Sequence, residues 1–68
     1  MNEDNLNMEI RKFLKKVGIT SQRIIEKEIY KADQNGNIKA GDEIEVEMIL
    51  SIKSLNTNDK ILGNIKID

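Results

Sequence analysis

The hydrophobic and polar positions of this 68-residue chain change their period near its middle. In the first half, apolar residues recur at helical spacing in two stretches, Leu6–Val17 and Ile25–Ala32. In the second half, apolar and polar residues alternate, which is typical of a β-strand with one face against a core. The pattern therefore predicts an α+β fold in which the helical part precedes the strands.

A glycine separates the two helical stretches. Gly18 can adopt the left-handed conformation that ends a helix, and Ile19 just after it can fold back on the preceding turn. Thr20 can then cap a new helix with its hydroxyl group. We therefore expect two helices, from about residue 4 to 17 and from 21 to about 33, joined as a helix-turn-helix corner.

Two alternating segments follow the helices and predict an antiparallel hairpin. The first runs from Ile44 to Ile52 and the second from Lys60 to Ile67, with a polar loop over 54–59. The Asn-Gly pair at 35–36 favours a turn that ends the helical part, and a short strand near Ile38 can join the sheet. The expected architecture is two N-terminal helices packed on a two- or three-stranded antiparallel sheet, in the order ααββ or αα(β)ββ.

One register of the hairpin suits the alternation of both strands. If Ile52 lies opposite Ile61, the apolar side chains of the two strands share one face. The same register places Glu47 opposite Lys66 on the polar face, where the two charges attract each other.

Two apolar residues interrupt the polar face of the expected hairpin. Ile49 and Leu62 would lie near each other there and be exposed. A single exposed apolar side chain is ordinary, but two together on so small a sheet predict a contact with another molecule. Ile49 and Leu62 are therefore one expected protein interface, and the basic side of the helix pair is the other.

Size and composition narrow the class of protein. Sixty-eight residues make a single small domain, 1–68, and the lack of cysteine and histidine excludes disulfides, zinc fingers and thiolate or imidazole chemistry. The chain has no long apolar run and begins with acidic residues, so we expect no signal peptide, no membrane span and a cytoplasmic location. Residues 1–40 carry a net charge of +2 and residues 41–68 a net charge of −3.

The basic helical half makes nucleic-acid binding the alternative function. A pair of helices joined at a glycine and followed by a hairpin has the layout of a winged helix-turn-helix. Its expected contacts are basic side chains of both helices: Arg11, Lys15, Arg23 and Lys27. The groove-facing side of the second helix would carry two isoleucines and an acid, and the whole chain is slightly acidic, which disfavours nucleic acid as a partner.

Metal binding and catalysis find little support in the residues. Asp33, Asn35 and Asn37 match the start of an EF-hand loop, but Ile38 and Ile44 stand where its glycine and its glutamate belong. The four glycines are scattered at turns and form no phosphate-binding loop. We therefore expect a protein that is not an enzyme and has no metal or cofactor.

One long run of residues resembles a known family. The run Arg11-Lys12-Phe13-Leu14-Lys15-Lys16-Val17-Gly18-Ile19-Thr20-Ser21-Gln22-Arg23 is similar to that of a family of short bacterial proteins classed as a domain of unknown function. The opening Met1–Asp4, the strand Ile44–Ile52 and the closing Gly63–Asp68 are similar as well, so the resemblance covers nearly the whole chain. It implies a freestanding small domain and brings no activity, ligand or site with it.

The expected function is a non-catalytic protein-interaction or accessory module. Its partner would be an unidentified protein or a second copy of the chain. Winged-helix-like nucleic-acid binding is the alternative. Substitution of Ile49 should disrupt binding of a protein partner, whereas substitution of Arg23 should abolish binding of nucleic acid.

Overall fold

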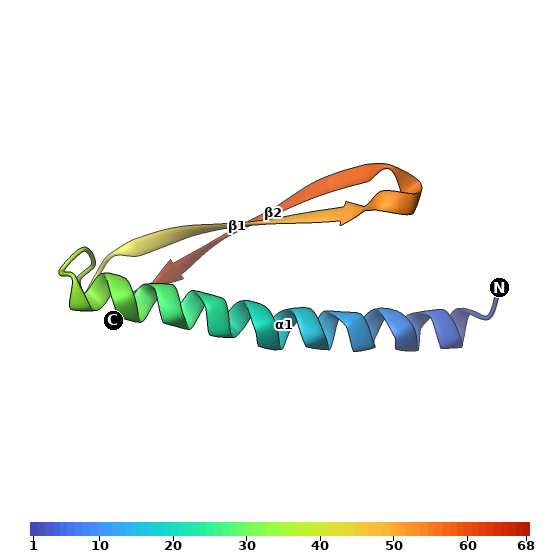
Figure 1. Ribbon diagram of the computed structural model, residues 1–68, viewed down its shortest axis with the longest axis horizontal. Helices are drawn as coiled ribbons and strands as arrows, with labels where there is room; N and C mark the ends of the chain where they lie inside the picture. The colour runs from blue at the N-terminus through green and yellow to red at the C-terminus, as the bar shows by residue number, and fades with distance from the viewer. The chain divides into compact units, whose positions relative to one another are not determined.

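The computed structural model describes all 68 residues and has one long helix followed by an antiparallel hairpin (Figure 1). The elements are α1 (Glu3–Gln34), β1 (Glu43–Ile52), the 3-10 turn η1 (Lys53–Leu55) and β2 (Thr57–Lys66). The chain forms two compact units, Met1–Asn37 with the helix and Ile38–Asp68 with the hairpin. The helical part precedes the strands as predicted, but the order is αββ, and the expectation of two helices on a sheet is wrong.

The predicted corner at Gly18 does not form. Gly18, Ile19 and Thr20 all lie inside α1, whose 32 residues span about 48 Å at 1.5 Å per residue. A glycine inside a helix costs only about 1 kcal/mol relative to alanine, whereas a proline costs about 3 kcal/mol, and the chain has no proline. Helical spacing on both sides of Gly18 therefore outweighs the local turn chemistry.

Both ends of α1 are capped by residues near them. At the N-terminus, the side chain of Asn2 accepts a hydrogen bond from the backbone N–H of Asn5 at 3.0 Å. At the C-terminus, Gly36 has a φ of +73°, and the N–H of Asn37 donates to the carbonyl of Ala32 at 2.9 Å. The prediction that the Asn35-Gly36 pair ends the helical part is confirmed.

The segment before β1 is a turn, so the sheet is the two-stranded one of the two predicted alternatives. The carboxylate of Asp42 accepts a hydrogen bond from the N–H of Lys39 at 3.0 Å, and Gly41 has a φ of +96°. The N–H of Gly41 donates to the carbonyl of Ile67 at 2.7 Å, which ties the turn to the end of the hairpin. This bend keeps Ile38 out of the β1–β2 ladder, so the sheet has two strands.

The register of the hairpin differs from the predicted one by four residues. Ile52 lies opposite Thr57 and not opposite Ile61. The reason is the turn, because η1 and Asn56 reverse the chain at once and β2 begins earlier than its apolar alternation suggests. Asn56 has a φ of +58°, a left-handed conformation that asparagine tolerates better than most residues.

The shift by four residues keeps every side chain on its predicted face. Strand side chains alternate with a period of two, so an even shift changes the cross-strand partners and not the faces. Glu47 therefore lies opposite Leu62, and its predicted pairing with Lys66 is wrong. Lys66 lies opposite Glu43 instead.

The chain has no buried core. No side chain of α1 or of the hairpin is buried, and large apolar side chains of both units are exposed. A two-stranded hairpin is marginally stable alone in water, and most helices in proteins depend on packing of an apolar face. The apolar surfaces of this chain are therefore the first place to look for its function.

Candidate protein interface

Four side chains of the hairpin form a compact group on its polar face. Ile49 lies opposite Lys60, and Glu47 lies opposite Leu62, so Ile49 and Leu62 occupy diagonal positions. Their side chains are among the most exposed apolar ones of the chain, at 64% for Ile49 and 75% for Leu62. We call Glu47, Ile49, Lys60 and Leu62 the hairpin patch.

The charges of the hairpin patch neutralise each other. The Oε1 atom of Glu47 lies 3.4 Å from the Nζ atom of Lys60, across the other diagonal. Both side chains are well exposed, so this ion pair stabilises the hairpin by less than about 1 kcal/mol. The ion pair also changes the character of the surface, because Ile49 and Leu62 then lie beside two side chains whose charges cancel.

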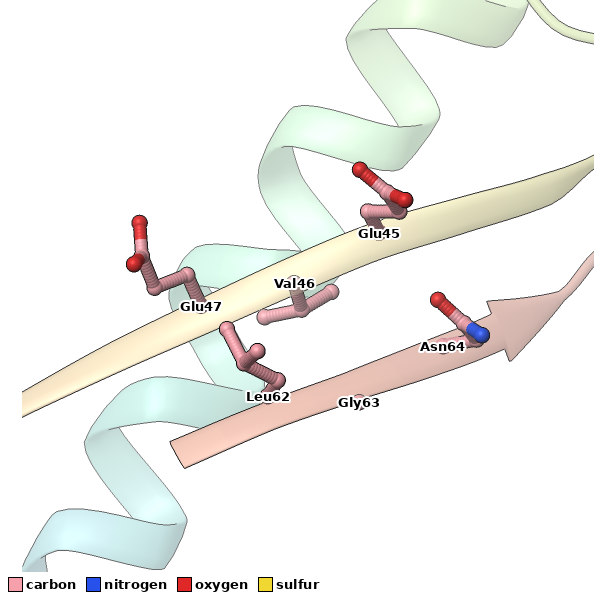
Figure 2. A pocket seen from close by; sticks show the side chains of 6 residues that line it. All are labelled: Glu45, Val46, Glu47, Leu62, Gly63 and Asn64. Carbon is pink, nitrogen blue, oxygen red and sulfur yellow. The ribbon is translucent and has the colours of Figure 1, made fainter. Parts of the chain in front are cut away.

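A shallow open depression borders the hairpin patch. It is lined by residues of both strands: Glu45, Val46, Glu47, Leu62, Gly63 and Asn64. Gly63 lies opposite Val46 on the other, apolar face of the hairpin, where its missing side chain leaves open space. Figure 2 shows the polar side chains of Glu45, Glu47 and Asn64 on the same side of the hairpin. The depression can admit a side chain of a partner next to Leu62.

The four basic residues expected to contact nucleic acid lie along one straight helix. Arg11 and Lys15 are one helical turn apart, and so are Arg23 and Lys27. The first and last of the four are 16 residues apart, which corresponds to about 24 Å along α1. Successive steps of four residues also rotate around the helix, so these side chains follow a spiral and do not form one patch.

The apolar face of α1 has a hollow that the sequence-based interpretation missed. It is lined by Phe13, Lys16, Val17, Thr20 and Ser21, which lie on both sides of Gly18. Apolar residues spaced by alternating steps of four and three mark this face of the helix in the sequence. A helix that ends at Gly18 would interrupt this spacing, so the predicted turn there conceals the hollow.

Comparison with models of protein families assigns the chain to a family. The model of a family of unknown function, DUF6494, matches residues 1–68. The chain belongs to this family. This match confirms the predicted resemblance to a domain of unknown function. The bacterial origin stays a prediction. No curated protein and no solved structure matches the chain.

For this DUF6494 chain, the residues that resemble an EF-hand loop serve the helix end. Asp33 is in the last turn of α1, Asn35 is its C-cap, and Asn37 donates to the helix backbone. The structure brings together no group of three acidic, histidine or cysteine side chains that could hold a metal ion. No helix of the structure combines the length and the apolar character that crossing a membrane requires.

Proposed function

We propose that this DUF6494 chain is a non-catalytic interaction module that binds a cytoplasmic protein partner through the hairpin patch. The observation that carries the proposal is the exposure of Ile49 and Leu62 on an otherwise polar strand face. Side chains of this kind contribute about 1.5–3 kcal/mol each when they are fully buried. Their exposure on so small a protein supports a contact that covers them.

The surroundings of the two side chains also suit a protein partner. Interfaces place apolar side chains at their centre and polar side chains at their rim. In the hairpin patch, Glu47 and Lys60 supply such a rim, and the depression beside Leu62 offers a place for a side chain of the partner. The module would then act as an accessory or regulatory subunit of that partner.

The test is affinity capture with the full chain and two variants. Ile49→Lys places a charge in the hairpin patch, and we expect it to remove the specific partner. Leu55→Lys is the matched control, because Leu55 is 67% exposed and lies in η1, outside the patch. Proteins are captured from a lysate of the source organism, and binding of each purified candidate is then measured by calorimetry.

The calorimetric result decides between the outcomes. Loss of binding in Ile49→Lys with normal binding in Leu55→Lys supports the proposal. A partner that binds both variants as well as the original chain would contradict it, because such a partner does not use the patch. Circular dichroism of each variant confirms that the hairpin and α1 remain folded.

A further inference from the structure

Six side chains of α1, five of them apolar, follow a heptad pattern across Gly18. From Leu6 to Ile24 the spacing alternates between four and three residues, and the six positions are Leu6, Ile10, Phe13, Val17, Thr20 and Ile24. We call these six residues the α1 seam. In heptad notation, Ile10, Val17 and Ile24 take position a, and Leu6, Phe13 and Thr20 take position d. Such a repeat is typical of helices that wind around one another.

We propose that the α1 seam is the contact surface for a second copy of this chain, in a parallel and in-register two-stranded coiled coil. All three a positions hold β-branched residues, and the first d position holds leucine. β-Branched residues at a combined with leucine at d favour two parallel strands over three or four, and Leu6 fits this rule, whereas Phe13 and Thr20 hold the other two d positions. Ile10, Phe13 and Ile24 are exposed at 46%, 59% and 57%, and Val17 is half-buried, so most of the seam is available to a partner.

The hollow on α1 matches this arrangement. In a parallel coiled coil, each a side chain inserts into a hole between four residues of the facing helix, namely the preceding d and g positions and the a and d positions at the same level. For Val17 of a second copy, these four are Phe13, Lys16, Val17 and Thr20. All four line the hollow. The hollow therefore lies where Val17 of a parallel, in-register copy would insert.

The charges beside the seam favour the same orientation. In a parallel pair, a g residue faces the e residue five positions later on the other helix. Arg23 then faces Glu28 of the second copy, Lys16 faces Ser21 and Glu9 faces Leu14, so one pair attracts and none repels. In the antiparallel arrangement over the same segment, Glu9 would face Arg23, but Lys16 would face Lys16 of the second copy, so one contact would repel.

The seam has a defined end. The next d and a positions after Ile24 are Lys27 and Lys31. Two lysines at these positions would place like charges between the helices, so the coiled coil stops after three a layers. A seam this short predicts a reversible dimer whose population depends on protein concentration. Because the α1 seam and the hairpin patch share no residue, this inference and the proposed function fail or hold independently.

The first measurement is sedimentation equilibrium of the full chain from low to high micromolar concentration. We expect a reversible change from a mass of 7.8 kDa to twice that value. Val17→Lys places a charge at the central a position and should raise the dissociation constant at least tenfold. Ile19→Lys is the matched control on the opposite side of α1, where an exposed isoleucine is replaced, and it should leave the dissociation constant unchanged.

A charge exchange tests the pairing without altering the apolar seam. Arg23→Glu alone should weaken the dimer severalfold, because it places two acids opposite each other. The double variant Arg23→Glu with Glu28→Arg should restore the original dissociation constant. A double variant as weak as the single one would contradict the predicted pair.

The orientation has its own test. Glu3 lies seven residues before Ile10, just ahead of the seam, and the chain has no cysteine, so Glu3→Cys introduces a unique thiol. A parallel dimer should form a disulfide between the two copies rapidly under mild oxidation, whereas an antiparallel one separates the two thiols by most of the length of the seam. A monomer at all concentrations, a trimer, a dimer that does not form the disulfide, or a dimer insensitive to Val17→Lys would each overturn the proposal. A dimer lost only in Ile49→Lys would assign self-association to the hairpin instead.

Discussion

Gly63 lies directly opposite Val46 in the β1–β2 ladder, and a Cβ atom added to Gly63 would meet no atom within 4 Å. The backbone of Gly63 does not have a positive φ. The position therefore accepts a side chain without strain and lies on the apolar face of the hairpin.

We predict that Gly63→Val stabilises the hairpin by about 1 kcal/mol, because valine suits a strand better than glycine and loses less backbone entropy on folding. Amide hydrogen exchange measures this locally in β1 and β2. Gly41→Val is the control, because Gly41 has a φ of +96°, and this variant should lower the protection of the hairpin amides. Equal protection in Gly63→Val and the original chain would contradict the prediction.

The helical state of Gly18 predicts the sign of another substitution. Gly18→Ala should stabilise α1 by about 0.5–1 kcal/mol, since alanine is the better helix former and the added Cβ meets no atom within 4 Å. The mean residue ellipticity at 222 nm and the thermal midpoint should both rise in magnitude. Gly36→Ala should do the opposite, because Gly36 has a φ of +73°. A loss of helix in Gly18→Ala would argue for a turn at this position.

The left-handed conformation of Asn56 predicts that the turn decides the register. Asn56→Gly should keep the hairpin and its register, whereas Asn56→Val should destabilise it by about 1–2 kcal/mol, because a β-branched residue is strained at a φ of +58°. Nuclear Overhauser contacts between Ile52 and Thr57 report the register directly. Their persistence at full strength in Asn56→Val would show that the strands alone fix the pairing.

The spiral of basic residues on α1 predicts weak binding to nucleic acid. Fluorescence anisotropy with a random duplex DNA and a single-stranded RNA should show no micromolar binding at moderate salt. Binding that weakens steeply with salt and is lost in Arg23→Glu would contradict this expectation and return attention to the basic residues.

The sequence predicts which parts of this chain are helix and strand better than it predicts where the helix ends or how the strands pair. The helical spacing, the alternation at the start of β1 and the Asn35-Gly36 helix end all appear in the structure. The predicted helix end at Gly18 is wrong because a glycine can end a helix or lie inside one at a cost of about 1 kcal/mol, and only the residues on both sides decide between the two. The register was misread because an alternating pattern is unchanged by a shift of an even number of residues.

The candidate surfaces also follow partly from the periodicity of the sequence and partly from the observed register and helix. Ile49 and Leu62 could be placed on one face from their parity alone, and the structure finds them there at diagonal positions. Their actual neighbours, Lys60 and Glu47, depend on the register and could not be named. The hollow around Val17 needed the continuous helix, which the local chemistry of Gly18 and Thr20 had concealed.

The two-stranded sheet leaves the outer edge of β1 unpaired, and the composition of this strand bears on how the protein behaves in concentrated solution. Glutamates occupy every second position at its start, Glu43, Glu45 and Glu47. Stacking β1 in parallel register on copies of itself would bring each carboxylate next to its own equivalent, and antiparallel pairings centred on any residue from Glu43 to Glu47 would set two of them opposite each other. Repulsion between these glutamates therefore opposes the addition of further β1 strands to the unpaired edge, and with it the growth of fibres.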